Sequence, residues 1–221
     1  MTRALDDRMR ILKRRLIADG VELIISGQEN PLALPADTDY HDSLKEGIVL
    51  TAPQLQRLKE KSELFRCDRE AARILALRDH SVGEFRDRLL RKRFAPSAVD
   101  RTTKKYRQLG ALDDARYANA VAEALLQRLP CGQAYLTSYL QKKRIARTLA
   151  EQAAQLLLSG RDPAAMAEEA LARRWSSFGQ FELEKARRRA YNYLARRGFS
   201  YDDARIAFEN LWTQKQEESE N

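Results

Sequence analysis

The sequence has few of the residues that build metal centres and disulfide frameworks. Its 221 residues contain two cysteines, Cys67 and Cys131, and two histidines, His41 and His80. Two cysteines provide no disulfide framework, and the four residues together match no metal-ligand spacing. This composition suits a reducing compartment. We therefore expect a cytoplasmic protein without a metal site.

The sequence also lacks the motifs of enzymes. It contains no Walker-type glycine loop, no Ser/His/Asp arrangement and no carboxylates at metal-ligand spacing. His80 follows Asp79 and is most simply interpreted as a polar residue at a helix end. We expect a protein that is not an enzyme, with no catalytic residue and no cofactor.

Long hydrophobic runs are missing as well. No uninterrupted apolar stretch approaches the ~20 residues that a membrane span needs. The first residues are charged and lack the apolar stretch of a signal peptide. Hydrophobic residues make up 43% of the chain and charged residues 33%. These values predict a soluble protein that buries a core and has no membrane partner.

Positive charge is concentrated in the middle of the chain. The net charge is +8, and residues 71–147 carry 17 basic against 7 acidic side chains. Residues 1–70 carry 12 and 13, and residues 148–221 carry 11 and 12. A focused basic segment favours a polyanion or an acidic protein groove as partner. The alternative is that abundant arginine only makes the helices soluble.

A six-residue box occurs three times and organises the chain after about residue 70. It covers residues 89–94, 140–145 and 194–199, and the first leucines of successive copies are 51 and 54 residues apart. In each copy a leucine and a large apolar residue bracket a basic pair. Repetition at a nearly fixed period indicates one supersecondary unit that is stacked several times.

Helix start and stop signals divide this region into three-helix units. The capping-box pattern at Ser81, Pro96 at a first turn, and Asp113, Asp162 and Ser200 as N-caps mark helix starts. We predict an all-α protein with three tandem three-helix repeats over residues 66–112, 113–160 and 161–213. Residues 214–221 are acidic and are expected to be disordered.

The first 65 residues read as a separate, small α/β extension. The spacing of Leu5, Met9, Leu12 and Leu16 predicts a helix over residues 5–17. Residues 21–25 and 32–35 could pair as a β-hairpin around the turn-forming residues 26–31. Residues 51–54 form a capping-box pattern before another helix. The domain order is therefore helix, hairpin, helix and then repeats.

The box has a structural and a functional interpretation. Basic residues in a last helical turn complement the helix dipole by ~0.3–1 kcal/mol each, and the bracketing apolar residues are core anchors. Gly198 stands where a helix end needs a left-handed residue, and Arg93 and Arg144 occupy that position in the other copies. Capping alone does not require three copies of such dense charge. A tandem array would present it at regular intervals to a periodic partner.

The sequence resembles the RecX family of regulators of RecA recombinase. The resemblance rests on residues 81–85, on 112–118 (LDDARYA) and on 194–200 (LARRGFS), and covers roughly residues 70–212. It implies an elongated, curved array of three-helix repeats that lies in the groove of the RecA–DNA filament. It also implies loss of ATPase and strand-exchange activity during recombination and DNA repair. The chain departs from the family at Arg93 and Arg144, which replace glycine, and after Gly132, where basic residues are usual.

The resemblance and the basic boxes together nominate residues for contact with DNA or with the filament. They are Arg86, Arg91, Lys92, Arg93, Lys104, Lys105, Arg116, Lys142, Lys143, Arg144, Arg196 and Arg197. The expected partners of a monomer are the RecA filament and, more weakly and with salt dependence, single- and double-stranded DNA. Tyr135 and Tyr139 beside these cations could stack on bases or form a half-buried pair. The alternatives are a stand-alone DNA-binding protein and a repeat scaffold for another acidic partner.

Overall fold

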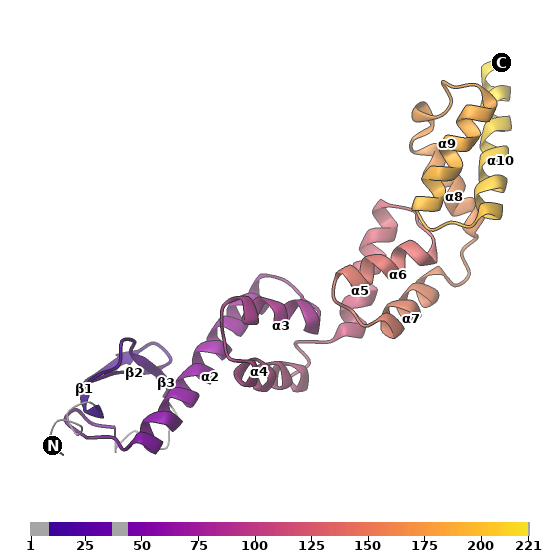
Figure 1. Ribbon diagram of the computed structural model, residues 1–221. Coiled ribbons are helices and arrows are strands. Elements are labelled where there is room, and N and C mark those ends of the chain that lie inside the picture. Colours follow the sequence, from indigo (N-terminus) through magenta and orange to yellow (C-terminus); the bar gives the residue numbers. More distant parts are fainter. Residues whose placement is uncertain (1–8, 37–43, 221) are drawn as a thin grey trace. The chain divides into compact units, whose positions relative to one another are not determined.

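The computed structural model describes residues 9–36 and 44–220 and is predominantly helical (Figure 1). The chain divides into two compact units. Unit 1 comprises the chain up to Asp79 together with Phe85–Leu112. Unit 2 comprises His80–Glu84 together with the chain from Asp113 onward. The division cuts helix α3, Val82–Arg91, near its start.

Unit 1 begins with a three-stranded antiparallel sheet in the order β1-β2-β3. The strands are β1, Ile11–Ile17; β2, Gly20–Ile25; and β3, Leu32–Pro35. Pairing of β2 with β3 confirms the hairpin expected from the sequence. The helix predicted over residues 5–17 is wrong for its described part, which forms β1. Residues 5–8 lie outside the described part of the chain.

Pairing with a distant segment explains why this helix does not form. Backbone hydrogen bonds pair β1 with β2 from Ile11 opposite Ile25 to Ile17 opposite Gly20. On its other edge, Ile11 exchanges backbone hydrogen bonds with residues 47 and 48. The helical spacing of the leucines is a weak preference that such tertiary pairing overrides. Leu12 and Leu16 remain exposed instead of forming an apolar helix face.

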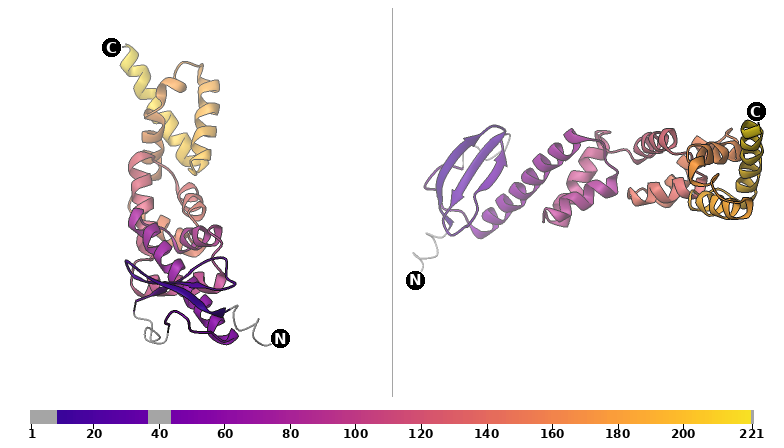
Figure 2. Two further views of the ribbon diagram at one scale, coloured as in Figure 1. Left: turned by 90° about the vertical axis from the view of Figure 1, so that its left-hand side faces the viewer. Right: turned by 90° about the horizontal axis from the view of Figure 1, so that it is seen from above.

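The buried face of the sheet packs against the first half of α2, Ala52–Leu77 (Figure 2). Ile11, Leu23 and Leu34 form one cluster with Leu55 and Leu58 of this helix. Thr51 caps α2 through the reciprocal capping box expected from the sequence. The helix then continues without a break past residue 65, where the sequence suggested a boundary between extension and repeats. One helix therefore belongs to both the sheet and the first three-helix group.

The first three-helix group consists of the second half of α2 with α3 and α4, Pro96–Gln108. Phe85 and Leu89 of α3 and Val99 of α4 have no exposed surface. α4 packs against α2, and the ring of Phe85 meets the ring of Tyr106 edge-on, with 6.0 Å between centroids. Pro96 occupies the first turn of α4, as predicted.

Unit 2 contains the other two three-helix groups. The second group comprises α5, Asp114–Arg128; α6, Gln133–Lys142; and α7, Arg147–Leu158. Its core gathers Leu126, Leu136, Leu140 and Ile145 with several alanines. Asp113 caps α5 by accepting hydrogen bonds from the amides of residues 115 and 116, which lowers the pKa of its carboxyl group.

The third group comprises α8, Pro163–Ala172; α9, Leu183–Arg196; and α10, Tyr201–Glu220. A short 3-10 turn, Trp175–Ser177, lies between α8 and α9. Trp175 and Trp212 are partly buried and pack against the core of this group. The disordered tail expected from residue 214 is wrong, because α10 continues to Glu220. Side-chain bonds from Gln214 and Lys215 to Glu218 link successive turns of this end.

Candidate nucleic-acid and partner interface

All three boxes have the same backbone geometry. The helix ends on a left-handed residue in each: φ is 64° at Arg93, 61° at Arg144 and 77° at Gly198. The amide of the sixth box residue donates to the carbonyl of the first, at 3.4, 3.3 and 3.2 Å in the three copies. This is the pattern of a Schellman C-cap. A side chain at the left-handed position costs about 1–2 kcal/mol, so two arginines are retained at an energetic cost.

The apolar residues of the box anchor this turn. Leu89, Leu140 and Leu194 each have 0% exposed surface. Ile145 and Phe199, which close the second and third boxes, are also buried. The sequence prediction of core anchors is confirmed for these five residues, whereas Phe94, which closes the first box, is half-buried. The basic residues of the second and third boxes are consequently carried on turns that the core fixes on both sides.

In unit 2 each box turn also contacts the N-terminal residues of a middle helix. The sequence analysis did not predict this contact. The carbonyl of Lys143 accepts a hydrogen bond from the Ser81 hydroxyl at 2.5 Å. The carbonyl of Arg197 accepts one from the amide of Gly132 at 2.8 Å. A β-carbon on Gly132 would lie 2.0 Å from the Gly198 carbonyl oxygen. The turns at 140–145 and 194–199 therefore pack against the start of another helix in addition to carrying basic residues. We call such a contact a packing joint.

The first box is stabilised by carboxylates of α2. Lys92 Nζ lies 2.8 Å from Glu70 Oε1, and the amide of Ala95 donates to Glu63 at 2.9 Å. Both partners are on the helix that also supports the sheet. Lys92 is thus engaged within the protein, although it remains exposed.

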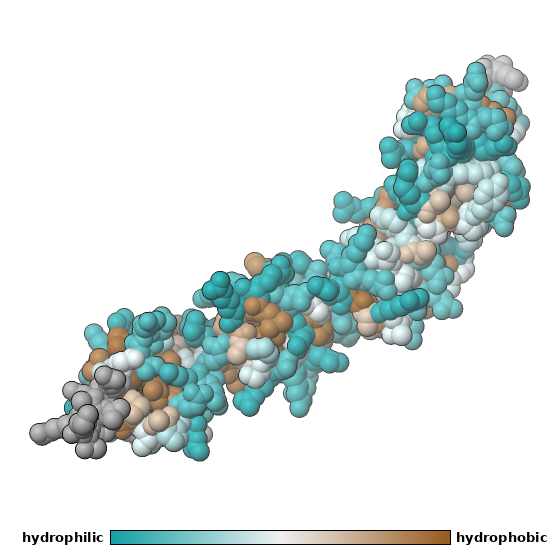
Figure 3. Space-filling view, in the orientation of Figure 1, coloured by the Kyte–Doolittle hydropathy of each residue, from teal (hydrophilic) through white to brown (hydrophobic). Residues whose placement is uncertain are grey.

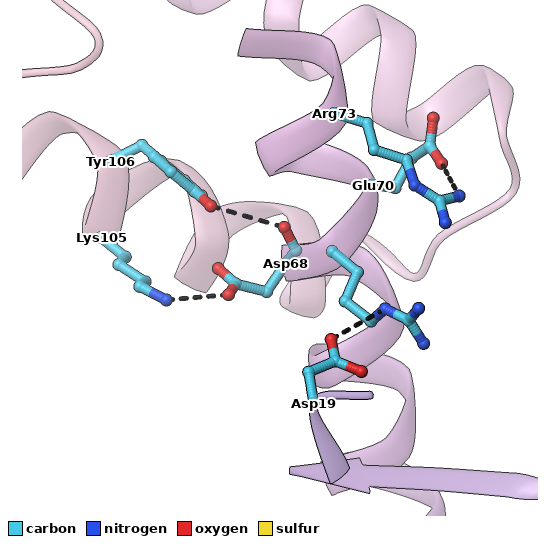
Figure 4. A network of polar contacts seen from close by, with 7 residues as sticks. Asp19, Asp68, Glu70, Arg73, Lys105 and Tyr106 are labelled. Atoms are coloured by element: carbon cyan, nitrogen blue, oxygen red, sulfur yellow. Dashed lines mark hydrogen bonds and ion pairs between the residues drawn. The ribbon is translucent and has the colours of Figure 1, made fainter. Parts of the chain in front are cut away.

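Two further candidates of unit 1 are held by acidic residues. Lys105 Nζ lies 2.8 Å from Asp68 Oδ2, and this hydrogen bond raises the pKa of Lys105 (Figure 4). The same view shows the Tyr106 hydroxyl directed at the backbone oxygen of Asp68. Arg86 forms an ion pair with Asp100. These cations present less free charge than the sequence suggested.

Two candidates of unit 2 lie over aromatic rings. Lys143 Nζ is 5.7 Å from the ring centroid of Tyr139, and Arg197 Cζ is 4.8 Å from that of Tyr193. Arg197 is half-buried, and its charge opposes the rise in the Cys131 pKa that burial causes. Tyr135 and Tyr139 are both half-buried, which favours the packed pair over an open stacking platform.

The remaining candidates are exposed. Four of them make no ion pair with a carboxylate among the described residues: Arg91, Lys104, Lys142 and Arg196. Arg93, Arg116 and Arg144 are exposed too. Each unit therefore presents its own set of cations: Arg91, Arg93 and Lys104 in unit 1, and the others in unit 2.

A second basic feature was missed by the sequence interpretation. Arg187, Arg188 and Arg189 follow one another on α9, and tyrosines at 191 and 201 lie beside them. Arg187, Arg188 and the two tyrosines border a cleft of about 750 Å³, whereas Arg189 does not line it. The run of three arginines was a visible signal, but it falls outside the repeated box. Hydrophilic side chains cover most of the visible surface of α9 and α10 (Figure 3).

Other kinds of site find no support in the described part of the chain. No group of three or more His, Cys, Asp or Glu residues within residues 9–36 and 44–220 could hold a metal ion. Among the described helices, none is long and apolar enough to cross a membrane. Both cysteines are buried and free.

Known proteins with similar sequences share one description. Residues 162–208 match the model of the third three-helix domain of RecX. The regulatory protein RecX of Chromohalobacter salexigens is 32% identical over 145 residues, which cover 65% of this chain and 91% of that protein. This chain belongs to the RecX family. The regulatory protein RecX of Pelodictyon phaeoclathratiforme is 27% identical, over 64% of this chain and 86% of that protein.

Solved RecX structures share the fold. A crystal structure of regulatory protein RecX superposes with a TM-score of 0.70 and 15% identity, over 91% of this chain and 99% of that one. RecX from Lactobacillus salivarius gives a TM-score of 0.58 and 20% identity, over 67% of this chain and 96% of that one. The first match covers more residues than the helical part of the chain contains, so it includes part of the N-terminal sheet. The helical fold with this extension is therefore shared with a solved RecX protein.

Proposed function

We propose that this RecX-family protein binds the RecA–DNA filament and inhibits its ATPase and strand-exchange activities. It would do so without catalysing a reaction, as a cytoplasmic monomer. The support is the family membership together with the cations that the box turns expose. The family supplies the regulatory role, and the cations supply chemistry that suits a partner rich in phosphate.

The observation that carries the proposal is that exposed cations without an ion-pair partner stand on turns whose backbone is held in place. Arg91, Lys142 and Arg196 each stand in the last turn of a middle helix that a Schellman cap and a buried leucine hold in place. Cations already fixed at their backbone lose less conformational entropy on binding phosphate than cations on a mobile loop. Each of these turns is therefore suited to bind a phosphate or a carboxylate of the partner.

The principal alternative is a protein that binds DNA directly and needs no filament. Its affinity would fall steeply with salt and would not depend on RecA or nucleotide. A filament regulator instead acts only on DNA that RecA covers. The two hypotheses are separated by adding the full chain to RecA, ATP and single-stranded DNA and measuring ATP hydrolysis.

Inhibition at concentrations far below those needed to bind naked DNA is the expected result. Unchanged hydrolysis with the protein in excess over RecA would overturn the proposal.

A second experiment measures filament binding by charge-reversed variants. The test variant changes four exposed cations without ion-pair partners: Arg91→Glu, Lys104→Glu, Lys142→Glu and Arg196→Glu. The control makes the same change in charge away from the box turns: Arg57→Glu, Lys59→Glu, Arg128→Glu and Arg161→Glu.

We expect the test variant to lose filament affinity by at least tenfold relative to the control, and the salt dependence of its remaining binding to flatten. Both variants should keep their helical circular dichroism, because exposed charges contribute little to folding. Equal losses in the two variants would mean that net charge alone matters, and the assignment of the box turns would be wrong.

A further inference from the structure

A cleft in the third three-helix group combines exposed aromatic and cationic side chains. It lies between α9 and the start of α10 and has a volume of about 750 Å³. Lys185, Arg188, Tyr191 and Asn192 line it from α9, and Tyr201 lines it from α10. All of these residues belong to unit 2. None of them is part of a box.

The two tyrosines form a series of edge-on ring contacts that runs from the buried core to the protein surface. Buried Phe208 meets Tyr191 edge-on, at 6.0 Å and 87°. Tyr191 in turn meets Tyr201 edge-on, at 5.3 Å and 88°. Tyr201 is 68% exposed. Its ring is therefore held in position from one side, while most of its surface is available to a ligand.

Two cations that line the cleft and a third beyond its lining, in the third box, follow one face of α9. Lys185, Arg188 and Arg196 are three and eight residues apart, so they lie within one sector of the helix and span about 16 Å along its axis. Each is exposed and forms no ion pair with a described carboxylate. Lys185 also lies 4.5 Å from the ring centroid of Phe181.

Neighbouring charges limit where an anion could lie. Arg187 is bound to Glu184, and Arg205 to Glu209. Asp202 and Asp203 follow Tyr201 at the start of α10, and the Asp203 carboxylate accepts hydrogen bonds from the amide and the hydroxyl of Ser200. The α10 side of the cleft is therefore unfavourable for phosphate, whereas the α9 row is favourable. The exposed ring of Tyr201, on α10, and the cations of α9 therefore lie on opposite sides of the cleft.

We infer that this cleft binds a segment of single-stranded DNA. A base stacks on Tyr201, and the backbone phosphates lie along Lys185, Arg188 and Arg196. An aromatic platform beside a cationic row is the arrangement that binds single strands without sequence preference. A duplex hides the faces of its bases, so it could use only the cations. The inference depends on the proposed function only for the source of the strand, which would be the filament's DNA.

The stacking contact is tested by fluorescence anisotropy of the full chain with labelled dT12 and with a 12-residue abasic strand, without RecA. We expect the wild-type protein to bind dT12 about tenfold more tightly than the abasic strand. Tyr201→Ala should remove this preference, and Tyr201→Phe should retain it because the ring is kept. Equal binding of both strands by the wild-type protein would overturn the inference and would favour an acidic protein as the occupant.

The cationic row has a matched control one residue away. Arg188→Gln and Arg189→Gln remove the same charge from the same helix, but the Arg189 guanidinium lies 4.6 Å from the Phe181 ring and does not line the cleft. Arg188→Gln should weaken dT12 binding and lower the salt slope by about 0.7, whereas Arg189→Gln should change both much less. Identical effects would contradict the assignment.

Binding of dT12 to the box turns could hide these effects, so a site-specific measurement accompanies them. Irradiation of a strand carrying 5-iodo-deoxyuridine should cross-link it to the peptide that contains Tyr201, as identified by mass spectrometry. A cross-link confined to other peptides would overturn the inference. These measurements contain no RecA. If the strand binds at Tyr201 but the protein leaves ATP hydrolysis by RecA unchanged, the proposed function is refuted and the present inference stands.

Discussion

At the scale of single residues, buried leucines determine whether a basic turn is held in place. Leu140 has no exposed surface and packs with Leu136 and Ile145. Leu140→Ala should lower the free energy of unfolding by about 2–5 kcal/mol through cavity formation. Urea unfolding followed by circular dichroism measures this loss. Leu156→Ala on the neighbouring helix is the control, because Leu156 is 64% exposed; a loss below about 1 kcal/mol at Leu140 would refute the anchor role.

Cys131 is a buried residue whose chemistry depends on pH. Burial raises the pKa of its thiol to about 11, against a smaller opposing effect of Arg197. At pH 8 only about one such thiol in a thousand is ionised, compared with roughly a quarter of free thiols. Labelling of the folded protein by a disulfide reagent should therefore be slow at pH 8 and should become fast in urea. Rapid labelling of Cys131 without denaturant would show that the site is open.

The same shift links the thiol to stability. The folded chain keeps the thiol neutral, so at high pH the unfolded chain binds fewer protons. The contribution of this group to stability is complete below the ordinary thiol pKa and is lost as the pH rises through about 11. The loss of stability between pH 8.5 and 11 should be smaller in Cys131→Ala than in the wild-type protein.

At the scale of elements, the box turn serves two purposes at once. It ends one helix with a Schellman cap, and in unit 2 it receives the N-terminal residues of another. These contacts use backbone carbonyls, so they leave the cationic ends of the side chains available. A turn that is fixed by packing and still exposes charge can combine a structural role with a binding role.

Gly132 tests the packing joint. A β-carbon there would lie 2.0 Å from a backbone oxygen of Gly198, and backbone atoms cannot move aside cheaply. Gly132→Ala should destabilise unit 2 by more than about 1 kcal/mol, although alanine normally stabilises a chain relative to glycine. Gly160→Ala is not an equivalent control, because φ there is 75°.

Ala134→Gly is a better comparison for that measurement. Ala134 is exposed in the same helix, and glycine there costs about 0.5–1 kcal/mol from backbone entropy alone. Denaturant midpoints of both variants give the comparison. If Gly132→Ala were as stable as the wild-type protein, the close approach to Gly198 would not hold in solution.

At the scale of the whole molecule, α2 connects the sheet to the first three-helix group. A chain that starts at Thr51 keeps the cap of α2 and loses the sheet. It exposes Leu55 and Leu58, so both are changed to Gln in this chain to prevent aggregation. We expect a folded helical protein, since Cys67, Ala71 and Ile74 of α2 remain buried in the helical group.

Circular dichroism and thermal unfolding measure the outcome of this truncation. Retained ellipticity and a cooperative transition are expected, together with retained inhibition of RecA at altered affinity. An unfolded product would mean that the sheet is needed for the helices to fold. A folded product without inhibition would place part of the RecA contact in the first 50 residues.

The sequence alone determined where most of the helices after residue 50 begin and end. Thr51, Asp113, Asp162 and Ser200 were recognisable as helix starts, and each caps a helix in the structure. The left-handed positions of the boxes were recognisable too. These signals can be read locally because a cap or a helix end is decided by hydrogen bonds within a few residues.

Only the tertiary structure decided the features that depend on distant parts of the chain. Residues 11–17 form a strand because β2 pairs with them, against their own helical spacing. Lys105 is neutralised by Asp68, which is 37 residues away, and Arg197 packs on Tyr193. The cleft at Tyr201 exists because α9 and α10 meet there. A local pattern shows which residues are basic or aromatic, but their partners depend on the packing of the whole chain.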